Sequence, residues 1–79
     1  MKIMVVIPMK PYRFWLARCE PTRAEYLWLK NGIIARNGDG REEVQILCDN
    51  ERAKLIMDYA ARACPEVLPY IQRIANPPY

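Results

Sequence analysis

The sequence of 79 residues contains no histidine and no serine, and its only threonine is Thr22. Nucleophilic catalysis of the serine or cysteine type needs a hydroxyl or thiol beside a base, and no such arrangement is visible. Catalysis and metal binding that depend on histidine are excluded as well. We therefore predict no catalytic residue, no metal site and no cofactor, and we do not expect an enzyme.

Cysteine is also scarce, and the three present are Cys19, Cys48 and Cys64. An odd number without a C-x-x-C pair disfavours a disulfide framework, and a zinc site would lack histidine ligands. We interpret the cysteines as small buried hydrophobic residues in a reducing compartment. One reactive thiol stays open as the alternative.

Long hydrophobic runs are absent. The apolar run Ile3–Ile7 ends at Pro8 and is followed by cations, which fits neither a signal peptide nor a membrane span of about 20 residues. A content of 52% hydrophobic and 27% charged residues is too apolar for a disordered chain. We expect one folded domain over residues 1–79, soluble and cytoplasmic.

Proline and glycine positions divide the chain into short elements. The β-branched run Ile3–Ile7 predicts a strand that is apolar on both faces. A second strand is predicted over Tyr12–Cys19, after Pro11. Residues 37–40, Asn-Gly-Asp-Gly, are typical of a turn, and a further strand follows over Arg41–Cys48.

Residues 20–31 admit two interpretations. A short helix would open with the capping-box spacing of Thr22 and Glu25 and close at Asn31-Gly32. Alternatively, Glu25–Lys30 is a strand, and Asn31-Gly32 is a type I′ turn into a strand over Ile33–Arg36. Four consecutive apolar positions suit a helix poorly, so we favour the hairpin.

The C-terminal part has the pattern of helices. Asp49 or Asn50 suits a helix N-cap, and an apolar stripe from Ala53 to Cys64 predicts a helix over Asn50–Ala63. A short helix is predicted over Pro69–Ala75. The predicted fold class is α+β: an antiparallel β-meander of four to five strands, followed by one long and one short C-terminal helix packed on one sheet face.

The net charge of +3 is unevenly distributed. Residues 1–41 hold eight basic and three acidic side chains, a net +5, whereas residues 42–79 hold four basic and six acidic ones, a net −2. A basic sheet with interleaved aromatic residues can bind nucleic acid through phosphates and stacked bases. A small nucleic-acid-binding protein is therefore the alternative function.

The first functional hypothesis is a non-enzymatic protein-binding module. Two helices can cover one sheet face only, yet Ile3–Ile7 is apolar on both sides, and Trp15 and Leu47 fall on the nominally polar side. This surplus apolar surface predicts a protein partner or a second copy, and thus a homodimer. Aromatic and arginine residues are the usual anchors of interfaces, and the candidates for partner binding are Arg13, Trp15, Arg18, Trp28 and Arg36.

Two C-terminal stretches are familiar together: Asn50–Ile56, after a glycine-rich hairpin and a strand, and the run Ala-Cys-Pro-Glu-Val-Leu at 63–68. This third of the chain resembles the C-terminal half of small phage and prophage accessory proteins, which usually have Ala-Ala-Pro at the start of the run. The resemblance implies a mobile-element origin and action by binding, as in a phage inhibitor or regulator of a host complex, such as a host-defence inhibitor. It transfers no functional residue.

Overall fold

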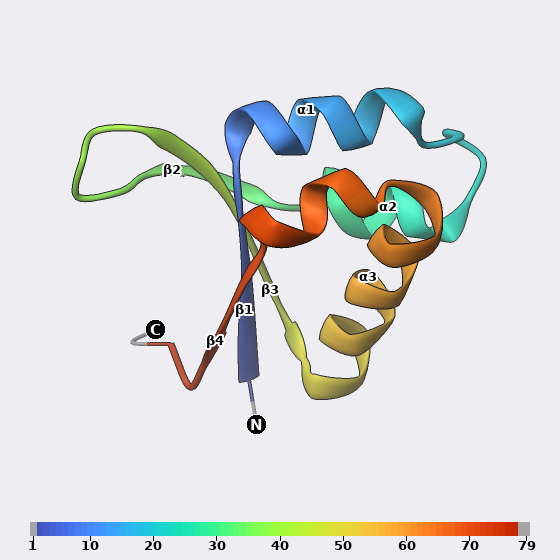
Figure 1. The fold of residues 1–79 in the computed structure, drawn as a ribbon. Helices are drawn as coiled ribbons and strands as arrows, with labels where there is room; N and C mark the ends of the chain where they lie inside the picture. The colour runs from blue at the N-terminus through green and yellow to red at the C-terminus, as the bar shows by residue number, and fades with distance from the viewer. Residues whose placement is uncertain (1, 78–79) are drawn as a thin grey trace.

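The computed structural model describes residues 2–77, which form a four-stranded sheet and its covering helices (Figure 1). The order along the chain is β1 (Lys2–Pro8), α1 (Met9–Arg18), α2 (Ala24–Lys30), β2 (Ile33–Arg36), β3 (Glu42–Asp49), α3 (Asn50–Ala63), the 3₁₀ helix η1 (Pro65–Tyr70) and β4 (Gln72–Ala75). The strand order in the sheet is β2-β3-β1-β4, with every neighbouring pair antiparallel. The class α+β and the antiparallel sheet are therefore correct, whereas the predicted meander with C-terminal helices is wrong.

The predicted strand Tyr12–Cys19 is instead most of helix α1. Tyr12, Trp15, Leu16 and Cys19 follow the i, i+3, i+4, i+7 spacing of one helical face. Trp15 and Cys19 are buried, and the other two pack against the core. Pro11 is compatible with the helix because it lies in the first turn, where backbone N–H groups have no intrahelical acceptor.

The favoured strand Glu25–Lys30 is also wrong, and the helical alternative is the observed one. Arg23 is the N-cap of α2 without a side-chain capping bond, so the expected capping box of Thr22 is not formed. A type I′ turn requires a positive φ at both central residues. Among the described glycines Gly40 has a positive φ and Gly32 does not, so Asn31-Gly32 does not form this turn.

The segment from β2 to α3 was predicted correctly. Asn37 closes the β2–β3 turn, because its side-chain Oδ1 accepts hydrogen bonds from the backbone N–H groups of Asp39 at 2.9 Å and Arg41 at 3.1 Å. Asp49 is the N-cap of α3 and accepts from the backbone N–H of Arg52 at 2.6 Å. Both features are local, so a sequence pattern suffices to locate them.

The predicted helix Pro69–Ala75 is wrong. The chain forms η1 over Pro65–Tyr70 and then extends as β4, which pairs with β1 in the register Met4↔Ile74. The backbone N–H and C=O groups on the side of β1 that faces away from β3 need hydrogen-bond partners. A strand at residues 72–75 provides them, and a helix there would not. The predicted order of strands followed by helices is therefore not observed: α1 and α2 lie between β1 and β2, and β4 follows the last helical segment.

The two faces of the sheet have different surroundings. Ile3, Val5 and Ile7 of β1 point to the face where α1, α2, α3 and η1 pack, and they form one cluster with buried helical residues such as Trp15 and Ile56. Figure 1 shows these helical segments gathered on one side of the strands. In the described residues 2–77, no helix covers the opposite face.

Candidate protein interface

The uncovered side of the sheet, called the open face here, is largely apolar. Because directly paired residues of antiparallel strands point the same way, the strand registers assign its members. They are Lys2, Met4, Val6, Pro8, Ile33, Ala35, Glu43, Gln45, Leu47, Asp49, Gln72 and Ile74. Seven of these twelve side chains are apolar, which is a high share for a sheet face exposed to water, where polar residues normally alternate with buried ones.

Exposure on the open face differs between its centre and its sides. Met4 and Val6 on β1 are buried beneath their neighbours, outside the main core cluster. Leu47 is 44% exposed, and Ile33 on one edge strand is 66% exposed. The polar members include Gln45, which donates to a carboxylate oxygen of Glu43 at 2.9 Å. The large exposed apolar side chains of the face are therefore Ile33, Leu47 and Ile74, on three strands beside the buried Met4 and Val6.

The free side of β2, called the β2 edge here, is a second unusual feature. Ile33 and Ile34 point to opposite sides of the sheet and are 66% and 61% exposed, the highest values among the large hydrophobic residues described. Edge strands in soluble proteins commonly carry protective charges or prolines. β2 has the sequence Ile-Ile-Ala-Arg, so only Arg36 at its end provides a charge.

The five predicted partner-binding residues do not form one site. Trp15 is fully buried in the core, with its ring centroid 5.8 Å from that of Tyr59, so no partner can reach it in this fold. Trp28 is half-buried on α2, and the Arg52 guanidinium lies 4.4 Å from its ring centroid. Both tryptophans thus contribute to packing within the chain.

The three predicted arginines lie on different surfaces. Arg13 is exposed on α1 and forms no ion pair among the described residues. Arg18 forms an ion pair with Glu66 at 3.0 Å and lies 4.4 Å from the ring centroid of Phe14. Arg36 donates to the backbone carbonyl of Gly40 at 2.8 Å. The chain brings none of these guanidinium groups together.

The basic sheet on which the nucleic-acid alternative depended is not formed. Its aromatic and basic residues at 12–18 belong to α1, where Lys10, Arg13 and Phe14 are exposed and Trp15 is buried. The alternative stays a prediction.

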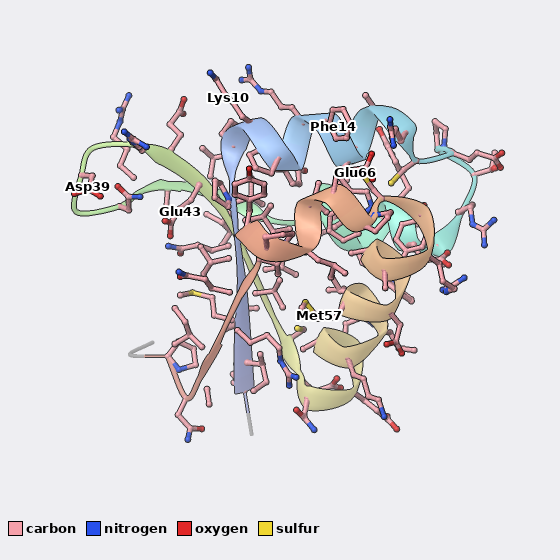
Figure 2. The ribbon with its side chains drawn as sticks, in the orientation of Figure 1. Lys10, Phe14, Asp39, Glu43, Met57 and Glu66 are labelled. Atoms are coloured by element: carbon pink, nitrogen blue, oxygen red, sulfur yellow. The ribbon has the colours of Figure 1, made fainter. Side chains whose placement is uncertain are left out.

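A broad cleft of about 1120 Å³ lies between α1, η1 and the β2–β3 turn. Figure 2 shows Asp39 at the tip of the turn, far from Glu66 on η1, with Lys10 and Phe14 on α1. Paired general acid–base catalysis needs two carboxylates that converge on one point. Four carboxylates line the cleft: Asp39, Glu42, Glu43 and Glu66. Glu42 and Glu43 are adjacent on β3 and point to opposite sides of the sheet, Glu43 accepts from Gln45, and Glu66 is paired with Arg18. We therefore assign no reaction to the cleft, and the absence of enzymatic activity stays a prediction.

The cysteines are all free thiols. Cys19 and Cys64 are buried and Cys48 is half-buried. Burial raises the pKa of Cys19 and of Cys48, which keeps both thiols protonated at neutral pH and lowers their nucleophilicity. In residues 2–77, no group of three or more histidine, cysteine or carboxylate residues is placed to hold a metal ion.

Known proteins provide no further assignment. No family model, no curated protein and no solved structure matches this chain. The resemblance to phage accessory proteins therefore stays a prediction. Within the described part of the chain, none of the helices has the length and apolar character needed to cross a membrane.

Sequence reasoning found part of the apolar surface and missed the rest. Leu47 was correctly placed on a side without helical cover, and the apolar residues of Ile3–Ile7 do divide between two faces. Ile74 was missed because it was assigned to a helix. Ile33 and Ile34 were missed as an edge because strand order depends on long-range pairing, although adjacent isoleucines in a four-residue strand are a visible signal.

Proposed function

We propose that the protein is a protein-binding module that uses the open face of its sheet. The observation that supports this most directly is that seven apolar side chains share a face which no helix of residues 2–77 covers. Removing apolar surface from water contributes about 25 cal/mol per Å² before the entropic cost of association is subtracted. Leu47 and Ile33, which are exposed in the free protein, have the most area to lose.

We expect the partner to be a different protein and not a second copy of this chain. Strands of four to eight residues, with a rise of about 3.3 Å and a spacing of about 4.8 Å, give the open face an area on the order of 400 Å². Two copies packed open face to open face would bury roughly 800 Å² in total, below the 1,200–2,000 Å² or so of stable interfaces. A different partner can be shaped to extend beyond the face, whereas this face-to-face pairing is limited to the small area of the face itself.

Site-specific photo-cross-linking at two matched leucines tests the proposal. Leu47 is 44% exposed on the open face, and Leu55 is 46% exposed on α3, away from it. Each is replaced in turn by benzoylphenylalanine, and the protein is irradiated in cells and in lysate. We expect position 47, and not position 55, to yield a discrete cross-linked protein. The same products from both positions, or none from position 47, would contradict the proposal.

The variants Leu47→Glu and Leu55→Glu separate binding from folding. Both substitutions are at half-exposed positions, so we expect each to change the free energy of unfolding by no more than about 1 kcal/mol. Leu47→Glu should abolish the cross-linked complex formed from a second open-face position, Ile74 on β4, which is 37% exposed, and Leu55→Glu should preserve it. Light scattering on purified protein identifies the predicted homodimer: a dimer lost only in Leu47→Glu would make the partner a second copy.

A further inference from the structure

We propose that the partner adds an extended strand to the β2 edge, antiparallel to Ile33–Arg36, and that this strand is apolar in its centre and acidic at its ends. This inference rests on the proposed function, since it names the chemistry of a protein partner. Added strands gain affinity from main-chain hydrogen bonds and specificity from alternate side chains. β2 has β3 on one side and, within residues 2–77, no strand on the other.

The exposed side chains of β2 support strand addition from both faces. Ile33 lies on the open face and Ile34 on the helical face, and both are more than 60% exposed. A neighbouring antiparallel strand places side chains about 5 Å from such residues on each face, so both isoleucines would be covered at once. A partner that binds the open face alone leaves Ile34 in water.

The two edges of the sheet differ in a way that selects β2. The opposite edge, β4, carries Gln72 and Arg73 and is followed by proline at 77. Arg73 donates to the side-chain Oδ1 of Asn50 at 2.7 Å, which ties β4 to α3. Charges and prolines are the usual protection of an edge strand, and the first three residues of β2 have none.

Charge determines the chemistry of the added strand. From Tyr26 to Gly38 the sequence contains no acidic residue. Its charged residues are Arg36, the last residue of β2, and Lys30, the last residue of α2, whose ammonium lies 5.8 Å from the ring centroid of Tyr26. Glu42 lies opposite Arg36 on β3 but forms no ion pair with it, because the guanidinium donates to the carbonyl of Gly40. A second copy of β2 would bring two more cations, whereas carboxylates at the ends of a foreign strand would complement both.

Two synthetic peptides test this inference against the purified full-length protein. Both have the core Val-Thr-Val-Thr-Val, and one carries two glutamates at each end whereas the other carries two lysines. Binding to isotope-labelled protein is followed by backbone amide shifts and hydrogen exchange. We expect the acidic peptide to slow exchange of the amides of Ile33–Arg36, and the basic peptide to bind about tenfold more weakly at low salt.

Variants distinguish the β2 edge from the open face. Ile34→Asn removes an exposed apolar side chain from the edge strand without changing the open face or the charge, and we expect it to weaken binding of the acidic peptide at least about tenfold. Leu27→Asn, at an exposed leucine of α2, is the matched control and should bind as the wild type does. Leu47→Glu should also retain binding, because Leu47 is not on the edge.

Each of the other possible results contradicts either strand addition at the β2 edge or the proposed function of the open face. The inference is overturned if neither peptide protects the β2 amides, if both bind equally, or if protection appears at β4. Loss of peptide binding in Leu47→Glu but not in Ile34→Asn would place the peptide on the open face, which overturns strand addition and supports the proposed function. Peptide binding as expected, without any cross-link from position 47, would instead remove the proposed function and leave the edge site standing.

Discussion

At the scale of single residues, Gly32 has a different structural role from the one that the sequence predicts. Asn-Gly predicts a type I′ turn, yet Gly32 lies at the end of α2 with its backbone against β3. A Cβ added there would overlap Cγ1 of Val44 and lie 3.1 Å from Cγ1 of Ile46. Glycine is therefore needed for close approach of the backbone, a requirement that no local pattern reveals.

Substitution of Gly32 by alanine should destabilise the protein by about 1–3 kcal/mol, because the buried Val44 and Ile46 must move to admit the methyl group. Gly38→Ala is the matched control. An added Cβ there meets no atom within 4 Å, so the free energy of unfolding should stay the same or rise by less than about 1 kcal/mol. Urea unfolding followed by tryptophan fluorescence measures both, and equal effects would contradict this account.

The burial of Tyr59 makes the stability of the protein depend on pH in the alkaline range. Burial, and then the neighbouring Cys19 thiol, raise the pKa of Tyr59 to about 12 from an ordinary value of 10. The folded state therefore favours the neutral hydroxyl, and the unfolded state releases its proton first. The stabilising contribution is complete below pH 10 and is lost as the pH rises from about 10 to about 12.

We expect Tyr59→Phe to reduce the loss of stability between pH 9 and pH 11, measured by urea midpoints at each pH. Tyr70→Phe, at an exposed tyrosine, should follow the wild type across this range. Phenylalanine cannot ionise, so the alkaline term of residue 59 disappears while the ring stays buried against Trp15. A pH dependence in Tyr59→Phe that equals that of the wild type would show that this hydroxyl titrates normally.

At the scale of elements, the predictions succeeded where the signal is local. The β1 run, the turn at 37–40, β3 and α3 each have a strong pattern within a few residues. The strand prediction for α1 was wrong because aromatic residues are common in strands, although the spacing of Tyr12, Trp15 and Cys19 is helical. Periodicity was the better guide there, since tertiary packing decides the conformation of such ambiguous segments.

β4 illustrates what a single sequence cannot supply. Gln72–Ala75 has no distinct strand pattern, and it becomes a strand because β1, about 70 residues earlier, offers it a free edge. The same dependence on distant pairing concealed the β2 edge. Composition alone indicated surplus apolar surface, and only the strand order β2-β3-β1-β4 locates that surface on one face and one edge.

At the scale of the whole molecule, stability should decrease from the centre of the sheet to its edges. β1 pairs with both β3 and β4, and Val5 and Ile7 are fully buried beneath the helices. Among the described residues, β2 pairs with β3 alone, and its isoleucines are exposed. Opening β2 exposes little further apolar area, whereas opening β1 requires disruption of the core, so the two should exchange through different events.

Native-state hydrogen exchange on dilute protein measures this gradient. We expect the amides of β1 to exchange only through global unfolding and the amides of β2 to exchange at least about a hundredfold faster. Urea should accelerate exchange in β1 more steeply than in β2, because global unfolding exposes more surface. If β2 were instead as well protected as β1, something would already cover its edge in the free protein. A β2 edge that is open in the free protein and protected by an acidic strand is what the proposed mode of binding requires.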